Sequence, residues 1–225
     1  MHQRLLSLAS LFTAVFFMAS CGNSELAVIP KSQIKAAQIK TTQGRPVQLA
    51  SKASQGIPAP SGDLLSTAAS KPRDKHSMPV YTFNERKRVV RTTAYTCTED
   101  DHLIYGNKNA TGTPLRYTNR VRSAAADWSF YPVGTTFRIK GLPYLYVIDD
   151  YGSALTGTGT VDLYKPNKEV MNLWGRRNVE LTIVQWGSFT RSAEILSQRT
   201  RHAHCAKMLA NIVRQRPDLA QLAMR

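Results

Sequence analysis

The second half of this 225-residue sequence predicts one small, mainly β domain with a short inserted helix. Short runs rich in β-branched and aromatic residues recur there, and Gly and Pro separate them, as is typical of small barrels and sandwiches. The chain length suits one ordinary domain with non-globular extensions. We assign the domain to residues 85–190. Its β-prone runs lie at residues 89–96, 135–139, 144–148 and 179–184.

The N-terminus, residues 1–21, has the architecture of an export signal, because Arg4 precedes an uncharged apolar run from Leu5 to Met18. This run is shorter than the ~20 residues that a transmembrane helix needs. Residues 18–21, MASC, resemble the bacterial lipobox and predict lipidation of Cys21, with Met18 where Leu is usual. The alternative is an ordinary cleaved signal. We therefore expect a lipid-anchored protein of the bacterial cell envelope that faces the periplasm. The outer membrane is the location that we favour for the anchor.

The next segment, residues 22–84, is rich in Ala, Ser, Gln, Lys and Pro and shows no sustained apolar period. Such a composition cannot bury enough apolar surface to offset the entropy lost on ordering. We therefore predict a flexible linker between the lipid anchor and the domain.

A short helix is expected at residues 168–174, between two strands. Asn167 can cap its first turn, and Gly175 can end it. The apolar residues of this segment share one face: Val170, Leu173 and Trp174.

Residues 191–225 predict a basic, amphipathic helical tail. Its apolar residues recur at helical spacing. This face is expected to pack against the domain or a protein partner, and a helix lying on a membrane surface is the alternative. The face consists of Cys205, Met208, Leu209, Ile212 and Val213.

The net charge of +15 lies mostly outside the domain, in the linker and the tail. Clustered Lys and Arg can bind nucleic acid. The export signal argues against nucleic acid as a partner, and wall carboxylates, anionic wall polymers or membrane surfaces are expected instead.

Two cysteines remain once Cys21 is assigned to the lipid anchor. Cys97 and Cys205 are an even pair in an oxidising compartment, which makes them a disulfide candidate. The alternative is two buried free thiols.

Acidic residues are scarce, with 15 Asp and Glu against 30 Lys and Arg. Four aspartates nevertheless lie beside Gly-containing or strand-like segments of the domain: Asp127, Asp149, Asp150 and Asp162. This pattern suggests an acid/base site. Asp149 and Asp150 end an apolar run, and on a strand they would point to opposite faces. Asp150 is preferred because it directly precedes a Gly turn. Apolar neighbours of Asp162 can desolvate it, and Asp127 either joins the site or caps a turn.

Two segments around these aspartates resemble the three-Asp (3D) domain family. The principal match is formed by residues 150–157, DYGSALTG, followed by residues 161–164, VDLY. Ser153 replaces the family's second Gly, Thr156 replaces its Lys, and one extra residue separates the two aspartates. Three further motifs follow the family order: residues 93–96 (TAYT), 111–114 (TGTP), and 126–127 (AD) with 131–135 (YPVGT).

The resemblance covers about residues 89–187 and implies a six-stranded double-psi β-barrel. The family includes the catalytic domain of membrane-bound lytic transglycosylase A and the stationary-phase survival proteins. It therefore implies cleavage of peptidoglycan between N-acetylmuramic acid and N-acetylglucosamine, with anhydro-muramic ends as products. Carried over by motif, Asp162 would be the principal acid/base, Asp150 its electrostatic assistant, and Asp127 the third member of the acidic cluster. A non-catalytic peptidoglycan-binding lipoprotein is the alternative.

Residues around the aspartates are candidates for sugar binding: Tyr95, Tyr151, Gly152 and Ser153, with Trp128 as a further aromatic. Packing in the barrel core is the alternative for each aromatic. No cofactor or metal is expected, because His102, His202 and His204 lack a spaced ligand set.

Overall fold

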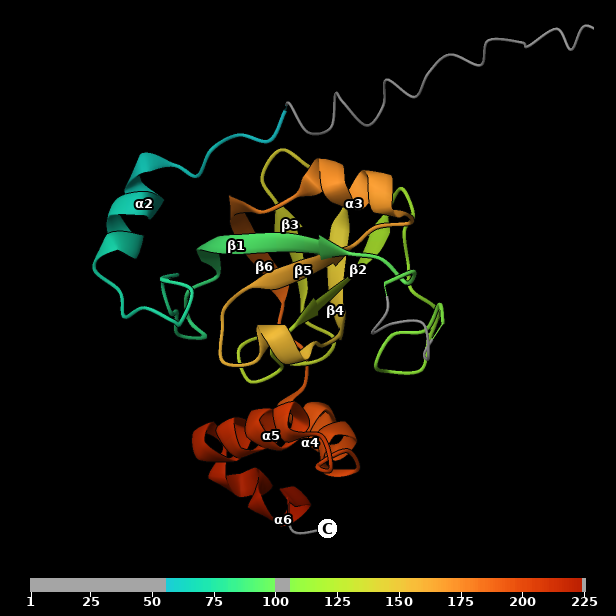
Figure 1. Cartoon of the computed structure of the whole chain (residues 1–225). Helices are drawn as coiled ribbons and strands as arrows, with labels where there is room; N and C mark the ends of the chain where they lie inside the picture. The colour runs from blue at the N-terminus through green and yellow to red at the C-terminus, as the bar shows by residue number, and fades with distance from the viewer. Residues whose placement is uncertain (1–55, 100–105, 224–225) are drawn as a thin grey trace, which may run out of the picture. The chain divides into compact units, whose positions relative to one another are not determined.

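The computed structural model describes residues 56–99 and 106–223 (Figure 1). The predicted signal peptide, the lipidation site Cys21, most of the predicted linker and His102 lie outside the described residues. None of the helices in the described ranges combines the length and the apolar character needed to cross a membrane.

Six strands close into a barrel in the order β1-β5-β2-β4-β3-β6, with β1 paired to both β5 and β6. Two pairings, β1 with β5 and β2 with β4, are parallel, and the other four are antiparallel. Closure leaves no strand edge free to pair with another chain. The strands are β1 (Lys87–Tyr95), β2 (Val121–Ala126), β3 (Thr136–Ile139), β4 (Leu145–Asp150), β5 (Val161–Tyr164) and β6 (Arg177–Gln185).

Alternate residues of the strands fill the interior, as the period of a strand requires. In β6, Val179, Leu181 and Ile183 are buried while their neighbours are partly or fully exposed. The rings of Phe137 in β3 and Tyr146 in β4 stack in the same core, with centroids 5.2 Å apart. The small β domain that the residue patterns predict is therefore present, with the six strands that the family resemblance implies.

The inserted helix α3 (Lys168–Trp174) has the predicted bounds. The Asn167 side chain accepts a hydrogen bond from the backbone N–H of Val170 at 2.9 Å, and Gly175 follows with a φ of 58°. Glycine adopts that left-handed conformation at little cost. Trp174 is buried, whereas Leu173 is 47% exposed, so only part of the apolar face packs against the barrel.

The C-terminal tail folds into two main helices, α4 (Phe189–Ser197) and α5 (Ala203–Gln215), which Figure 1 shows next to each other. A 3-10 turn, η3 (Pro217–Leu219), and a short helix, α6 (Ala220–Ala223), follow. The tail packs on its own barrel: the hydroxyl of Ser192 accepts a hydrogen bond from the N–H of Val133, and the α5 apolar face joins the barrel's hydrophobic cluster. Its buried members are Cys205, Met208, Leu209 and Ile212.

The predicted disulfide between Cys97 and Cys205 is wrong, because both residues are free thiols. Cys205 is buried in the cluster that joins α5 to the barrel. Cys97 packs in a second cluster, where its Sγ lies 3.7 Å from the hydroxyl of Tyr164. The two thiols therefore belong to different clusters of the core. The alternative of two buried free thiols is correct for Cys205, whereas the free thiol of Cys97 is partly exposed.

The prediction that the flexible linker extends to residue 84 is wrong for residues 56–84. This segment contains helix α2 (Gly62–Ala69) and packs against β1, where Ala68 and Met78 form a small cluster with Val89. The backbone N–H of Ser61 donates to Glu180 at 3.0 Å. The apolar residues of this segment are too widely spaced to produce a helical or strand periodicity in the sequence. They are nevertheless buried, because they pack on the outer surface of the barrel at β1.

Substituting Met78→Ala tests whether this segment belongs to the folded domain. Met78 is only 8% exposed, so we expect the variant to lose about 2 kcal/mol of unfolding free energy, measured by urea denaturation. Leu65→Ala is the matched control because Leu65 of α2 is 47% exposed. Equal stability of the two variants would show that residues 56–84 do not contribute to the fold.

Candidate active site

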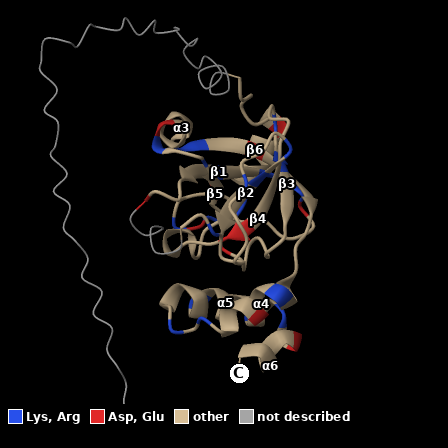
Figure 2. Cartoon of the chain, turned by 90° about the vertical axis from the view of Figure 1, so that its right-hand side faces the viewer, with Lys and Arg blue, Asp and Glu red and all other residues tan. Residues whose placement is uncertain are grey.

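A cavity of about 310 Å³ opens at the ends of β1, β4 and β5. It brings together two of the three predicted catalytic residues, Asp150 and Asp162, and all four residues predicted to bind sugar. Figure 2 shows acidic residues at the end of β4, where this site lies. The lining is formed by His76, Arg91, Thr93, Ala94, Tyr95, Glu99, Ala125, Asp150, Tyr151, Gly152, Ser153, Ala154, Leu155, Thr160 and Asp162.

The register of the central strand β2 brings the two aspartates together. Ala125 pairs with Asp162 of β5 on one side and with Asp150 of β4 on the other. Two strand spacings, roughly 10 Å, therefore separate the backbones of the aspartates. The extra residue in the loop before β5 does not displace Asp162 from the cavity.

A bulge in β4 decides which of the two neighbouring aspartates lines the cavity. Ala124 pairs with Ile148, but the next residue of β2, Ala125, pairs with Asp150, so Asp149 is the additional residue. Bulges commonly re-aim side chains next to active sites. Asp150 lines the cavity and Asp149 does not, in agreement with the choice made from the sequence.

Asp150 is 6% exposed, and hydrogen bonds reach both of its carboxylate oxygens. Its Oδ1 accepts from the backbone N–H groups of Ala110 and Tyr151, both at 3.0 Å, and its Oδ2 accepts from the hydroxyl of Tyr95 at 3.1 Å. Burial and the carboxylates of Asp150, Asp149 and Asp162 raise the pKa of Tyr95, so its hydroxyl remains a donor. The Asp150 carboxylate is thus fixed in position.

Asp162 occupies the opposite side of the cavity on β5 and is partly exposed. Its Oδ1 accepts a hydrogen bond from the hydroxyl of Thr93 at 2.7 Å, and Thr93 is its register partner on the parallel strand β1. A partly exposed carboxyl group that lines a cavity can exchange a proton with a bound ligand.

The aromatic candidates differ in position. Trp128 is fully buried and lies behind the site, where its Nε1 donates to the backbone oxygen of Asp150 at 2.9 Å. Its ring meets Tyr151 edge-on, with centroids 5.0 Å apart. Arg199, between α4 and α5, donates to the Tyr151 hydroxyl at 3.0 Å. Trp128 therefore supports the site from the core, while Tyr95 and Tyr151 line the cavity.

Asp127 does not line the cavity, contrary to its predicted place in the acidic cluster. It is fully buried, and its Oδ1 accepts from the backbone N–H of Ser129 at 2.7 Å and from the Ser129 hydroxyl at 2.6 Å. Its Oδ2 accepts from the N–H of Gly157 at 2.6 Å. Asp127 therefore links the turn after β2 to the loop before β5. This is the structural, turn-capping role that the sequence left open as the alternative to a place in the site.

His76 and Arg91 are among the lining residues that sequence reasoning missed. His76 lies in the segment taken as a linker, and Arg91 is one of many basic residues on a strand, so neither carried a signal. The described residues include no group of three or more His, Cys, Asp or Glu side chains placed to hold a metal ion. The rings of His202 and His204 are near each other, with centroids 5.7 Å apart.

Asp127→Asn should destabilise the fold, because an amide has one oxygen and cannot accept from both Ser129 and Gly157 without placing an NH₂ against an N–H donor. We expect a loss of about 1–3 kcal/mol in urea denaturation. Asp63→Asn, on the exposed surface of α2, removes the same charge and serves as control. An unchanged unfolding midpoint for Asp127→Asn would contradict the structural role.

Asp149→Asn should alter how stability depends on pH. Burial, opposed by the hydrogen bond from Ser123 at 2.7 Å, raises the pKa of Asp149 to about 6. An unfolded Asp titrates near pH 4, so the folded state holds this proton more tightly. The stability that the proton provides is complete below about pH 4 and is lost as the pH rises through about 6.

Asn is always uncharged, so the variant should match the wild type at pH 4 and exceed it at pH 7 by up to about 3 kcal/mol. Urea denaturation of both proteins at several pH values measures the difference. A constant difference between pH 4 and 7 would show that Asp149 does not titrate in this range.

A comparison with family models matches residues 122–185 to the family described as the 3D domain. The match spans β2 to β6 and includes Asp127, Asp150 and Asp162, while β1, which supplies Thr93 and Tyr95, precedes it. No curated protein matches the chain. 3D domains are associated with lytic transglycosylase-like catalytic domains. Residues 122–185 of this chain are thus similar to the 3D domain family, in agreement with the resemblance of their motifs.

Proposed function

We propose that the domain is a peptidoglycan lytic transglycosylase, which cleaves the bond between N-acetylmuramic acid and N-acetylglucosamine and leaves anhydro-muramic ends. The observation that carries this proposal is the meeting of Asp162 and Asp150 across one cavity of about 310 Å³. A cavity of this size suits a sugar-sized ligand. The 3D domain match supports the same class of substrate.

In this mechanism Asp162 acts first as an acid and then as a base. Its carboxylic proton moves to the glycosidic oxygen as the C1–O bond breaks. The C6 hydroxyl of the same muramic residue then attacks C1, and its proton returns to the Asp162 carboxylate. The C1–O6 bond replaces the glycosidic bond, so no water is consumed and no carboxylate nucleophile is required.

Asp150 would stabilise the positive charge that develops on the sugar ring in an oxocarbenium-like transition state. The hydrogen bonds from Tyr95, Ala110 and Tyr151 keep the carboxylate in place, so it need not reorganise as the charge forms. The turn after β4 supplies polar and aromatic contacts on the same wall, from Tyr151, Gly152 and Ser153.

We propose that Cys21 carries the lipid that holds the protein at the periplasmic face of the envelope, which would bring the cavity to its peptidoglycan substrate. We also propose that the barrel is of the double-psi type, because both parallel pairings, β1 with β5 and β2 with β4, join strands that are not consecutive in the chain.

Asp162→Asn tests the proposal. Asn keeps an oxygen that accepts from Thr93, so the fold should survive, but the acidic proton is lost. Purified protein is incubated with murein sacculi, and anhydro-muropeptides are measured by mass spectrometry. We expect the variant to form product at least about 100-fold more slowly than the wild type.

Asp63→Asn is the charge-matched control and should retain the wild-type rate. Equal rates for the Asp162→Asn variant and the wild type would remove Asp162 from the mechanism. Co-sedimentation of the wild type with sacculi without any product would instead indicate a non-catalytic peptidoglycan-binding protein.

A further inference from the structure

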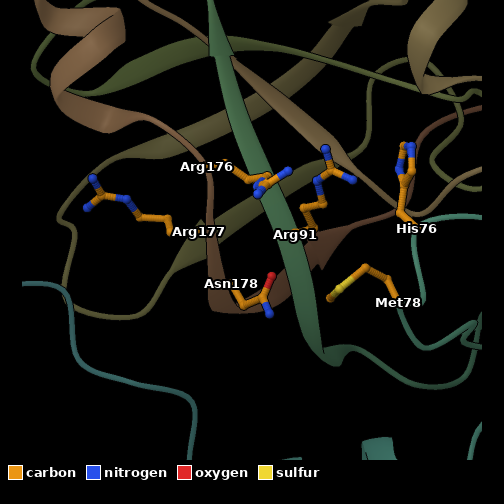
Figure 3. A pocket seen from close by; sticks show the side chains of 6 residues that line it. All are labelled: His76, Met78, Arg91, Arg176, Arg177 and Asn178. Carbon is orange, nitrogen blue, oxygen red and sulfur yellow. The ribbon is translucent and has the colours of Figure 1, made fainter.

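A second cavity, of about 380 Å³, adjoins the candidate active site. Two residues, His76 and Arg91, line both cavities, so the second continues the first. None of its six lining residues is acidic, and three are arginines. They are His76, Met78, Arg91, Arg176, Arg177 and Asn178, shown in Figure 3.

The structure assigns Arg177 to the fold rather than to a ligand. Its Nε donates to the backbone oxygen of Trp174 at 2.8 Å, and its Nη2 donates to that of Leu173 at 2.9 Å. The guanidinium also lies over the Trp174 ring, 4.5 Å from its centroid. These bonds satisfy carbonyls at the end of α3. Figure 3 shows the Arg177 side chain pointing away from the other two arginines.

Arg91 and Arg176 make no comparable bonds to backbone oxygens of residues 56–99 and 106–223. In Figure 3 their side chains extend toward His76, which lines the same cavity. The Nε of Arg91 is buried and finds no hydrogen-bond partner within the described part of the chain. A buried donor without a partner is costly, so its retention in a cavity wall points to a ligand that accepts from it.

Asp74 is the acidic residue next to His76, and its carboxylate accepts hydrogen bonds from backbone N–H groups. Its Oδ1 accepts from the N–H groups of His76 and Met78 at 2.8 and 2.9 Å, and its Oδ2 accepts from that of Gly159 at 2.9 Å. Asp74 therefore shapes the turn that presents His76 to the cavity. Burial and then the charge of Arg91 lower the pKa of His76, the charge of Asp74 raises it, and Lys75 and Arg176 lower it by smaller amounts.

We propose that Arg91 and Arg176, beside His76, bind a carboxylate of the glycan substrate while the neighbouring sugar occupies the cavity with Asp150 and Asp162. The inference rests on the proposed function and deepens it. Guanidinium groups match a carboxylate in charge and in planar geometry. In peptidoglycan this carboxylate comes from the stem peptide or, where the peptide has been removed, from the lactyl group of muramic acid.

The test uses the full chain and compares Arg91→Gln, Arg176→Gln and the double variant with the wild type. Arg176 is exposed, so Arg176→Gln keeps the test valid even if Arg91→Gln does not fold. Arg191→Gln is the matched control, because Arg191 is exposed on α4 and its loss changes the net charge equally. Binding is measured by co-sedimentation with sacculi, and KM and kcat from the release of anhydro-muropeptides.

We expect the double variant to bind sacculi about tenfold more weakly, with KM raised in proportion and kcat little changed. Amidation of the substrate carboxylates with a carbodiimide should weaken wild-type binding by the same factor and leave binding by the double variant unaffected. An effect on intact sacculi assigns the carboxylate to the stem peptide, and an effect on amidase-treated strands assigns it to the lactyl group. Either result supports the inference.

The two proposals fail in different ways. The carboxylate site would be overturned, and the enzyme retained, by the following result. The wild type cleaves the strands, the double variant has the same KM and binding as the wild type, and amidated substrate binds as well as unmodified substrate. Arginine-dependent binding of carboxylate-bearing strands without any anhydro product would overturn the enzyme and leave the carboxylate site. An equal loss in Arg191→Gln would show that net charge alone drives binding, which also overturns the carboxylate site.

Discussion

The pairing of β2 with a strand on each side is the constraint on which the candidate site depends. One small residue, Ala125, is in register with Asp162 on one side and with Asp150 on the other. Any slip of either pairing by one residue would turn one of the aspartates away from the cavity, because strand side chains alternate between faces. Closure of the barrel protects this register, since each strand is held by two neighbours.

Patterns of a few neighbouring residues predicted those elements of the fold whose formation depends on neighbouring residues. The cap at Asn167 and the turn at Gly175 defined α3, and β-prone runs with Gly and Pro between them predicted most of the strands. The choice of Asp150 over Asp149 also agrees with the structure, although the cause is a bulge rather than simple alternation. Resemblance supplied Asp162, whose cavity position depends on long-range pairing that no short pattern encodes.

The errors arose where contacts between distant segments decide the outcome. Residues 56–84 bury only a few apolar side chains, and their backbone bonds go to loops far along the chain, such as Asp74 to Gly159. Asp127 has the same sequence surroundings whether it faces a ligand or caps a turn, and only the positions of Ser129 and Gly157 distinguish the two. The cysteine pair satisfied every compositional rule for a disulfide but lies in separate clusters.

The docking of residues 56–84 on the barrel has a consequence for the boundaries of the working unit. The family match begins at residue 122, yet β1 closes the barrel, and the preceding segment carries His76 into the walls of both cavities. A fragment limited to residues 122–185 would lack strand β1 of the barrel. A fragment that begins at β1 would lack His76, which lines both cavities. The smallest fragment that keeps the lining of both cavities therefore begins before α2. It also includes the C-terminal tail, because Arg199 of the tail donates a hydrogen bond to the Tyr151 hydroxyl.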